Sequence, residues 1–479
     1  MLLFILILIT LGFLLFNFGL SNNDYMHPAV IFHLVFLLYE IVCLSGVQAY
    51  AITLHLSTVI VLTVGFTTMT LANLMTHRYG GIRNERRVEL REIRIPRFYL
   101  YTIIVLQLLS IIFFYVYLKR IAAIYGESYG TAPTSINGMI KLYDTLTKFW
   151  TSTFKKMAVP IPMVYRITNP ICAGAEYVVL YEMVNNFLIR KRKNFLLELF
   201  IFIFMCARIL MNGSRSPLLR VFTFIFLLMY VLNYRRGKVK KGNLKFLGKL
   251  VLALGLFGIA MFLALIIMGR NDSSFTGIAD HLFVYLGAPI VNLDTFLETN
   301  TIKLFEGINI KAPLGAQTFK GLYSYIGKWL HVIEFQNITG IGKFAFSPNC
   351  REIGNVYTMF YKIIYDFGHI GIVPLTLLMS IYYCFTYRRV MTKPNVKRII
   401  DFGLLVYAYL FNDLVMSPFS NRFYETVFDA VFVKFIIMAW LIDFFIVENK
   451  LRFKTPTRLV FIKHFRFCGF LDKFTNTSL

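Results

Sequence analysis

Arginine residues at the ends of long apolar segments are the groups of this sequence best placed to do chemistry. Arg215 stands in the turn NGSRSP, where Ser216 and Pro217 favour the start of a helix. The free N–H groups at that helix start and an adjacent guanidinium are suited to binding phosphate. Arg208 lies inside an apolar segment, where an arginine is costly and usually functional. Three further arginines flank apolar segments: Arg270, Arg351 and Arg422.

Each of these arginines also has a structural explanation. Arg215 suits an ordinary turn whose side chain extends to the lipid surface. Arg270 suits the C-terminal end of a helix, where a cation meets the negative end of the dipole. Arg351 and Arg422, each taken alone, suit an exposed surface. Together with Arg208, however, the five guanidinium groups make a phosphate-binding set at one face of the protein.

The segment 349–371, NCREIGNVYTMFYKIIYDFGHIG, is the most distinctive stretch of the chain. It leads into an apolar segment and places four polar side chains near that point: Asn355, Tyr357, Thr358 and Asp366. Its structural alternative is a helix start whose Asp366 pairs with an arginine.

The composition excludes most soluble classes of protein. Of 479 residues, 57% are hydrophobic and 16% are charged, against about 45–50% and about 25% in globular domains. The net charge of +25 points to nucleic acid or to a membrane surface. Because the basic residues lie between long apolar runs and not on a solvated face, a nucleic-acid partner is excluded. The six cysteines form no CxxC pair, so neither a zinc site nor a disulfide framework is supported.

Eleven apolar segments are long enough to cross a membrane, since a bilayer core of about 30 Å needs about 20 mostly apolar residues in a helix. We therefore expect an all-α, polytopic integral membrane bundle of about eleven transmembrane helices, forming one domain over residues 1–479. The segments are 1–20, 28–47, 50–74, 98–118, 168–189, 195–212, 217–234, 248–269, 365–387, 399–416 and 426–447.

Lysine and arginine are concentrated in five short segments that connect these helices or follow them. They hold thirty of the 50 basic residues, and with eleven spans all five fall on one side. The positive-inside rule assigns that side, and with it the C-terminus, to the cytoplasm. The segments are 75–97, 190–193, 235–249, 388–398 and the tail 448–479.

Two long segments then face outward: a first outer loop at 119–167 and a large extracytoplasmic loop at 270–364, between spans eight and nine. Within the second, 278–298 and 316–335 have apolar residues at helical spacing. We expect them to lie on the membrane surface or to cap the bundle.

The combination of NGSRSP between two spans, YLGAPIVNLD in the large outer loop and NVYTMFYKIIYDFGHIG before the ninth span resembles a known family. It is that of the oligosaccharide repeat unit polymerases, the Wzy-type O-antigen and capsular polysaccharide polymerases. The polytopic layout fits over nearly the whole chain. The resemblance implies a GT-C-like, multi-pass glycosyltransferase in the bacterial cytoplasmic membrane.

In such an enzyme the donor is a growing glycan on undecaprenyl diphosphate, and the acceptor is one lipid-linked repeat unit. The resemblance implies no cofactor, no metal and no nucleotide sugar. The expected partners are this undecaprenyl-diphosphate-linked oligosaccharide, membrane lipids, a flippase and a chain-length regulator.

The leaving diphosphate develops negative charge, which fixed cations stabilise. We assign Arg215 and Arg270 to the diphosphate, with Arg208, Arg351 and Arg422 in support. The acceptor hydroxyl needs a general base. Asp366 has the motif match, and His281 is of the residue type most often used as a general base; the sequence does not choose between these two and Glu334, Glu352 or His369. The expected glycan contacts are Tyr285, Asn355 and Tyr357, although tyrosines near a membrane surface are also common anchors.

Other functions fit the same layout. An O-antigen ligase would pass the glycan to a different acceptor. A flippase for lipid-linked oligosaccharides should have more charges inside its spans and no need of a large outer loop. A scaffold or receptor would not need the outer arginines.

Overall fold

The computed structural model describes residues 1–77, 89–148, 150–191, 193–214, 216–238, 248, 278–300, 314–332, 344–392 and 399–447. Several expected features lie outside these ranges. They are Arg215, Arg270, Glu334, the tail 448–479 and, apart from residue 248, the eighth apolar segment 248–269.

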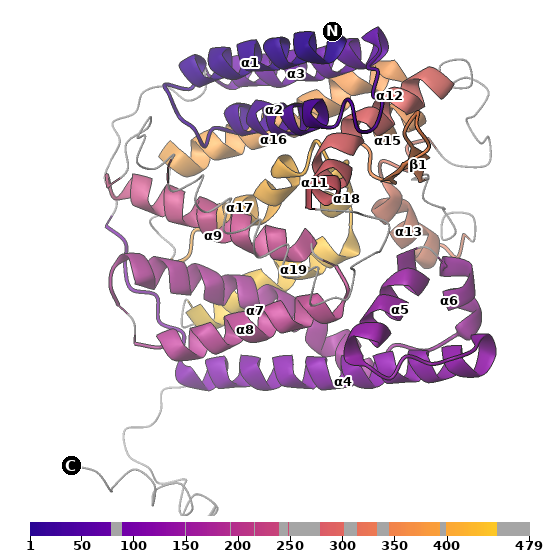
Figure 1. Ribbon diagram of the computed structural model, residues 1–479. Helices are drawn as coiled ribbons and strands as arrows, with labels where there is room; N and C mark the ends of the chain where they lie inside the picture. Colours follow the sequence, from indigo (N-terminus) through magenta and orange to yellow (C-terminus); the bar gives the residue numbers. More distant parts are fainter. Residues whose placement is uncertain are drawn as a thin grey trace, which may run out of the picture.

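The described chain is almost entirely helical (Figure 1), which confirms the all-α expectation. Seven helical stretches among the described residues are long and apolar enough to cross a membrane, so the chain is a polytopic membrane protein; the count of eleven spans stays a prediction. Six of the stretches each correspond to one main helix: α1 (Leu2–Leu20), α2 (Pro28–Ser45), α3 (Leu56–His77), α4 (Arg97–Tyr129), α9 (Ser216–Arg235) and α16 (Ile372–Thr392). The seventh consists of α19 (Ala430–Ile442) and the π-helical turn η4 (Asp443–Val447). Three more helices run beside them: α7 (Met163–Leu188), α8 (Phe195–Met211) and α17 (Phe402–Val415).

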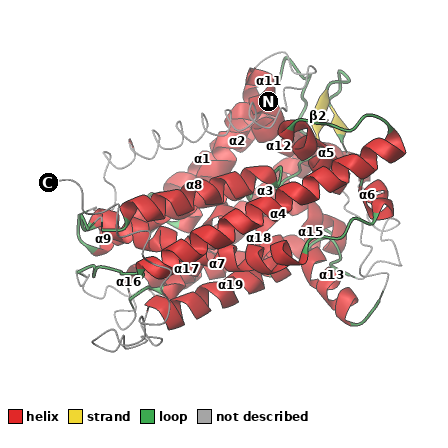
Figure 2. Ribbon diagram, turned by 90° about the horizontal axis from the view of Figure 1, so that it is seen from below, coloured by secondary structure: helices red, strands yellow, loops and turns green. Residues whose placement is uncertain are grey.

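These helices lie side by side with roughly parallel or antiparallel axes (Figures 1 and 2). On one side of the bundle α1 packs on α2, and α3 packs on α16. On the opposite side α4 packs on α7 and α8. Between them α9 packs on α17, and α19 packs on α7.

The distribution of apolar side chains is that of a protein in lipid. Phe4, Leu8 and Leu15 of α1 are all more than half exposed, whereas polar groups pair between helices. Thr10 donates to Glu40 at 2.8 Å, for example. Apolar residues facing outward and satisfied polar groups facing inward are favoured where the solvent is hydrocarbon.

The two ends of the bundle differ, and hydrogen bonds define each. At the end we call the basic end, Arg97 donates to Asn194, Arg236 donates to the Leu188 carbonyl, and Arg235 donates to the Val390 carbonyl. These bonds bring residues of three basic segments, 75–97, 235–249 and 388–398, together with residues that flank the fourth, 190–193.

We call the other end the capped end. There the turn between α2 and α3 is hydrogen-bonded to the large outer segment. Tyr50 donates to Asp280 at 2.9 Å, and Asn349 donates to the Ala49 carbonyl at 2.8 Å. The capping elements are α11 (Ile278–Leu282), the π-helical turn η2 (Phe283–Gly287), α12 (Ala288–Asn300), α13 (Lys320–Trp329), β1 (Ala345–Phe346), β2 (Glu352–Gly354), α15 (Phe360–Phe367) and α18 (Arg422–Val427). β1 and β2 pair in an antiparallel manner.

The expected surface helices are present, and the first of them caps the bundle. In α12, Ile290, Leu293 and Leu297 are completely buried, because this helix packs against α2 and α3. The second forms α13, which is shorter than the expected 316–335.

Two expected spans are interrupted near the capped end. The ninth, 365–387, is divided at Gly368, whose φ of +66° ends α15. A side chain at this φ would strain the backbone, so glycine permits the change of direction. A short 3-10 turn, η3 (His369–Gly371), then leads into α16. The eleventh, 426–447, is divided at Asp429, whose carboxylate accepts from Val431 and starts α19.

The first outer segment, expected as a loop over 119–167, is mostly helical. Helix α4 continues to Tyr129, and it is followed by α5 (Ile136–Lys148) and α6 (Thr151–Met157). A separate hydrophobic cluster holds these helices together, with Leu118, Ile121 and Met139 among its buried members. The outer segment is therefore not an irregular loop but contains three helical stretches, with α5 packed on the end of α4.

Candidate functional site

Segments that the sequence singled out meet at the capped end. Asn292 of α12 donates to the Val356 carbonyl at 2.8 Å, and Met359 donates its backbone N–H to the Ser417 carbonyl at 2.9 Å. Phe296 packs edge-on against Tyr361 at 4.6 Å. The motifs YLGAPIVNLD, NVYTMFYKIIYDFG and SPFSNRFYE therefore share one region, although up to about 130 residues separate them in sequence.

Arg220, in the first turns of α9, links this region to the bundle. Its Nη2 donates to Asp413 Oδ1 at 2.8 Å and to Thr426 at 3.2 Å, and its Nη1 donates to the Tyr409 hydroxyl at 3.0 Å. The guanidinium carbon also lies 4.5 Å from the centre of the Tyr409 ring. The Asp413 side chain is completely buried, so this ion pair fixes α9, α17 and α18 relative to one another.

Arg208 is likewise bound by a carboxylate. Its Nε and Nη2 donate to the two oxygens of Glu176 at 3.2 and 2.5 Å, and its Nη1 donates to Asn169. Gln107 bonds the same carboxylate at 2.7 Å. Because these partners occupy the guanidinium, Arg208 is not open to an anion in this structure. The sequence analysis missed Glu176 as its partner.

Two cations contact one carboxylate at the surface of this region, and a third cation interacts with it electrostatically. Lys362 of α15 bonds Glu425 Oε1 at 2.5 Å, and Arg422 lies 3.6 Å from Glu425 Oε2. Lys320, the first residue of α13, is the third cation, since it interacts electrostatically with both Lys362 and Glu425. We call these three cations the Lys320–Lys362–Arg422 cluster. Their positive charges outnumber the single negative charge of Glu425.

The pKa values of the cluster reflect this imbalance. Burial, and then repulsion by Lys362, hold the pKa of Lys320 below its usual value. Burial opposes ionisation of Glu425, but Lys362 and Arg422 outweigh it and lower the pKa of that carboxyl. An anion placed among the cations would relieve the same repulsion.

Buried polar atoms without partners lie beside the cluster. Asn421 is only 1% exposed, yet neither its amide oxygen nor its amide nitrogen has a hydrogen-bond partner within the described chain. The Ser420 hydroxyl, the Arg422 Nε and the Thr358 hydroxyl are buried without partners in the same part of the structure. Native proteins leave few such atoms, and each calls for an explanation such as a water or a ligand.

Among the described residues, no arginine pairs with Asp366. Its carboxylate accepts from the backbone N–H groups of Gln317 and Thr318, the shortest bond being 2.6 Å. It thereby holds the turn before α13 against α15 and positions Lys320. Burial raises the pKa of Asp366 against these hydrogen bonds, which suits a proton acceptor better than an ordinary surface carboxylate would.

The structure does not bring His281 and Arg351 to the cluster. His281 lies on α11, and the Arg351 guanidinium lies 5.6 Å from the ring of Tyr50, in the turn that α11 contacts. Figure 1 superposes α11 and α18, but the turned view of Figure 2 separates them widely.

Among the other expected residues, Tyr357 stacks on Tyr361 at 4.0 Å. Tyr285 and Asn355 are half-buried at the capped end. His369 and Glu352 are exposed. Within the described residues, no three His, Cys, Asp or Glu side chains are grouped so as to hold a metal ion.

The sequence analysis missed Lys320, Lys362 and Glu425. The signal that could have found the two lysines is the one that identified the arginines, namely a cation on the side expected to face outward, where the positive-inside rule disfavours it. Lys362 lies inside the distinctive 349–371 segment itself. No sequence signal marks Glu425 as their partner.

No family model, curated protein or solved structure matches the chain. The function proposed below depends on the contacts described above.

Proposed function

We propose that this chain is a GT-C-like membrane glycosyltransferase that polymerises undecaprenyl-diphosphate-linked oligosaccharide repeat units into a surface polysaccharide. The reaction would take place at the outer face of the bacterial cytoplasmic membrane. The observation that carries the proposal is the Lys320–Lys362–Arg422 cluster. In it Lys362 and Arg422 contact Glu425, Lys320 interacts with Lys362 and Glu425 electrostatically, and polar atoms nearby are buried without partners among the described residues.

The chemistry of the cluster suits a leaving diphosphate. The acceptor hydroxyl oxygen bonds the anomeric carbon of the donor glycan, and the bond from that carbon to the diphosphate oxygen breaks. Undecaprenyl diphosphate leaves with the electron pair, and preorganised cations stabilise the charge that develops on it. The charges of Lys320, Lys362 and Arg422 are already fixed by their helices, so little reorganisation is needed.

The acceptor proton needs a base near the cations. Asp366 lies one turn of α15 beyond Lys362, and its buried carboxylate has the raised pKa noted above. We assign it this role in preference to His281, because α11 lies apart from α18 in Figure 2. Arg215 and Arg270 stay in the proposal as further diphosphate ligands from the outer face. Arg220 would support the site through Asp413 and α18.

The proposal is tested with purified protein in lipid nanodiscs and lipid-linked repeat units as the only substrate. We expect ladders of longer lipid-linked glycan in the presence of a chelator and without nucleotide sugar. Lys320→Met should abolish the ladder, while Lys328→Met, at an exposed lysine of the same helix, should not. Equal ladders from both variants would exclude the cluster, and no ladder from the wild type would exclude the polymerase. A ligase would instead require a different acceptor.

A transporter of lipid-linked oligosaccharides is the second candidate. Two buried ion pairs inside the bundle, Arg208–Glu176 and Arg220–Asp413, favour it, because charges within spans often mark substrate pathways. In sealed vesicles, movement of labelled repeat units across the bilayer without lengthening would support this function over the polymerase.

A further inference from the structure

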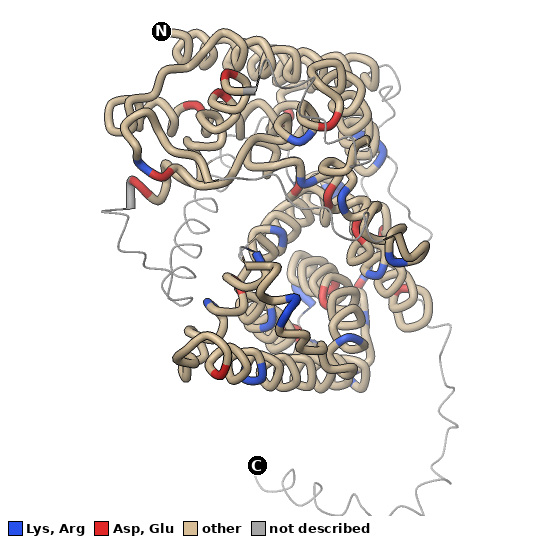
Figure 3. The backbone as a smooth tube through the Cα atoms, turned by 90° about the vertical axis from the view of Figure 1, so that its right-hand side faces the viewer, with Lys and Arg blue, Asp and Glu red and all other residues tan. Residues whose placement is uncertain are grey.

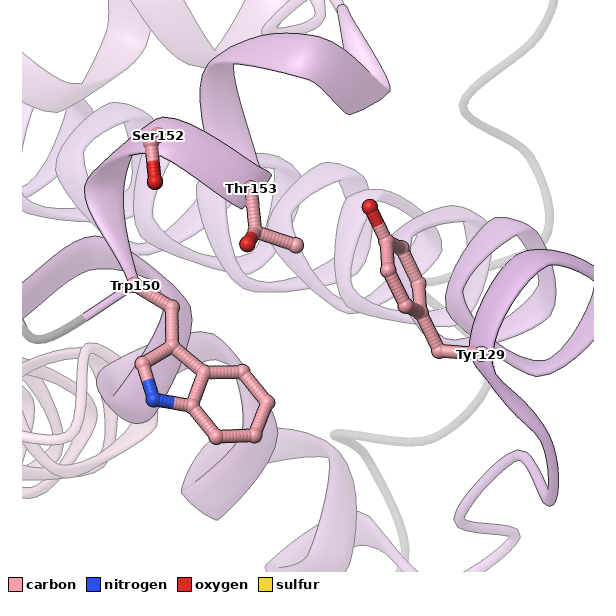
Figure 4. Close-up of a pocket in the computed structure, with 4 residues that line it drawn as sticks. All are labelled: Tyr129, Trp150, Ser152 and Thr153. Carbon is pink, nitrogen blue, oxygen red and sulfur yellow. The ribbon is translucent and has the colours of Figure 1, made fainter.

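A cleft lined by two aromatic rings lies at the end of the first outer segment. Tyr129, the last residue of α4, faces Trp150 across a space of about 340 Å³, and Ser152 and Thr153 of α6 complete its lining (Figure 4). The volume falls within the range of small-ligand pockets, about 300–1,000 Å³. Both rings are exposed although they are large, at 51% for Tyr129 and 48% for Trp150.

The length of α4 is enough to carry the cleft beyond the lipid headgroups. Helix α4 has 33 residues and so measures about 50 Å, well over the hydrocarbon thickness of about 30 Å. Lys119 and Arg120, both exposed, mark where its lipid-facing part ends. Tyr129 lies a further ~15 Å along the helix. The headgroup layer is only about 5–8 Å thick on each side, so these rings are too far out to be membrane anchors.

Helix α5 does not bring this element down onto the membrane either. It is amphipathic, but Met139, Ile140 and Leu146 on its apolar face are buried against α4. A helix that lies on a membrane inserts that face into the lipid. The apolar face of α5 is already used inside the protein.

The chemistry of the lining matches a sugar ring. A pyranose has apolar C–H faces that stack on aromatic rings, and hydroxyl groups that exchange hydrogen bonds with Ser and Thr side chains. In Figure 4 the Thr153 side chain lies between the two rings, and the Ser152 hydroxyl is close by. An exposed pair of rings beside hydroxyl groups suits a ligand with both kinds of surface.

The charge of this element indicates an acidic ligand. Residues 119–167 contain seven Lys or Arg and two Asp or Glu, on the side where basic residues are disfavoured. Lys155 and Lys156 of α6 are exposed close to Trp150 in sequence. Lys155 also repels Lys320 electrostatically, so the positive charge of α6 acts on the Lys320–Lys362–Arg422 cluster.

We propose that the Tyr129–Trp150 cleft binds a sugar ring of an acidic oligosaccharide, the glycan part of the lipid-linked substrate, whose diphosphate lies at the Lys320–Lys362–Arg422 cluster. The assignment of the ligand rests on the proposed function. The cleft is then a glycan subsite in the first outer segment, separate from Tyr285, Asn355 and Tyr357. It holds the chain outside the membrane while the reaction occurs at the cluster.

Tryptophan fluorescence tests this directly, because the chain has three tryptophans, at 150, 329 and 440. A protein carrying Trp329→Phe and Trp440→Phe keeps Trp150 as its single reporter. The matched control carries Trp150→Phe and Trp440→Phe and reports from Trp329, which is 74% exposed on α13. Both are placed in nanodiscs of zwitterionic lipid. The probes are oligosaccharides released by mild acid from the surface polysaccharide of the source organism, separated into acidic and neutral fractions.

We expect the acidic fraction to cause a saturable change in Trp150 emission and none in Trp329 emission. Tyr129→Ala should weaken this binding about tenfold, because one stacking surface is lost. Tyr101→Ala, at an exposed tyrosine near the other end of α4, should leave it unchanged. The double variant Lys155→Ala/Lys156→Ala should weaken binding of the acidic fraction selectively.

Other outcomes overturn the proposal. An unchanged Trp150 signal with every fraction excludes glycan binding at the cleft, and preference for the neutral fraction excludes an acidic ligand. A shift of Trp150 emission to shorter wavelength with phosphatidylglycerol vesicles, and none with glycan, would make the element a membrane anchor. Glycan binding at Trp150 without any polymer ladder would support the glycan subsite and exclude the polymerase function. A polymer ladder without any change in Trp150 emission would support the polymerase function and exclude the subsite.

Discussion

The two ends of the bundle use similar residues in opposite ways. At the basic end, Arg235 has a buried partner in Asp401 at 2.6 Å and a second in the Val390 carbonyl. At the capped end, Lys362 and Arg422 share Glu425, and within the described part of the chain both amide atoms of Asn421 are buried without partners. Polar groups that are fully paired hold helices together, whereas a surplus of charge beside unpaired polar atoms is suited to a ligand.

Figure 3, which views the molecule from the right-hand side of Figure 1, shows blue Lys and Arg positions over several of the chain segments that face the viewer. The total charge of the chain therefore says less about a binding site than the pairing of charged groups at each end does. The following experiments test this contrast, beginning with the largest expected effect.

Removing a fully paired arginine should lower the free energy of unfolding more than removing the arginine of the cluster does. Arg235→Ala leaves the Asp401 carboxylate without its cation, so we expect a loss of about 3–5 kcal/mol in the free energy of unfolding. Arg422→Ala should cost less than about 1 kcal/mol, because its ion pair is long and a third exposed, and Lys362 still binds Glu425. Unfolding in detergent measures both variants. Similar losses would remove the distinction between the ends.

The cluster should instead control the reaction rate. Lys362→Met removes a cation that stabilises the leaving diphosphate, so turnover should fall by about 10²–10³-fold while the thermal unfolding curve stays in place. The initial rate of ladder formation at saturating substrate measures turnover. A variant that loses both activity and fold would indicate a structural ion pair with Glu425.

The Asp366→Asn variant distinguishes two roles of Asp366, that of a general base and that of a residue that only positions Lys320. The asparagine oxygen can still accept from the Thr318 N–H, so the turn before α13 should stay in place. Loss of the proton acceptor should lower turnover by about 10²-fold, near the lower limit for general bases. The pH profile should also lose its acidic limb. If the rate and its pH profile are unchanged, Asp366 only positions Lys320.

The smallest effect we expect is a dependence of diphosphate affinity on pH. The pKa of Lys320 is lowered in the free protein by burial and by Lys362. A bound anion raises it again, so binding takes up a proton between the two values. Affinity for inorganic pyrophosphate should therefore fall as pH rises through that range, by at most about tenfold per pH unit. Lys320→Arg should flatten the curve, and titration calorimetry in two buffers would measure the proton uptake.

Much of the bundle could be predicted because apolar length is a local property. The first three spans match α1, α2 and α3 to within a few residues, apart from the longer gap before Leu56. The breaks at Gly368 and Asp429 were missed because the mean apolarity of a segment does not show where a helix inside it changes direction. The end of α4 was missed because its stabilising partner, α5, is itself amphipathic and lies in the following segment.

Partners were harder to predict than single residues. Arg208 was expected to be unusual, and it is, but Glu176 lies 32 residues earlier on another helix. Arg220 and Asp413 were each visible in the sequence, and nothing in it joined them. Pairing between distant helices depends on their rotation about their axes, which a single sequence does not specify.

The excess length of α4 has a further consequence. A continuous helix is stiff, so with the membrane placement argued above α4 would hold the Tyr129–Trp150 cleft at a constant height over the bilayer. On the proposals above, a substrate must extend from a phosphate group near the lipid surface to that height before both sites are filled. The protein would then measure its substrate: repeat units too short to reach the cleft would bind weakly, and adding or removing one turn of α4 would change which glycan length is accepted.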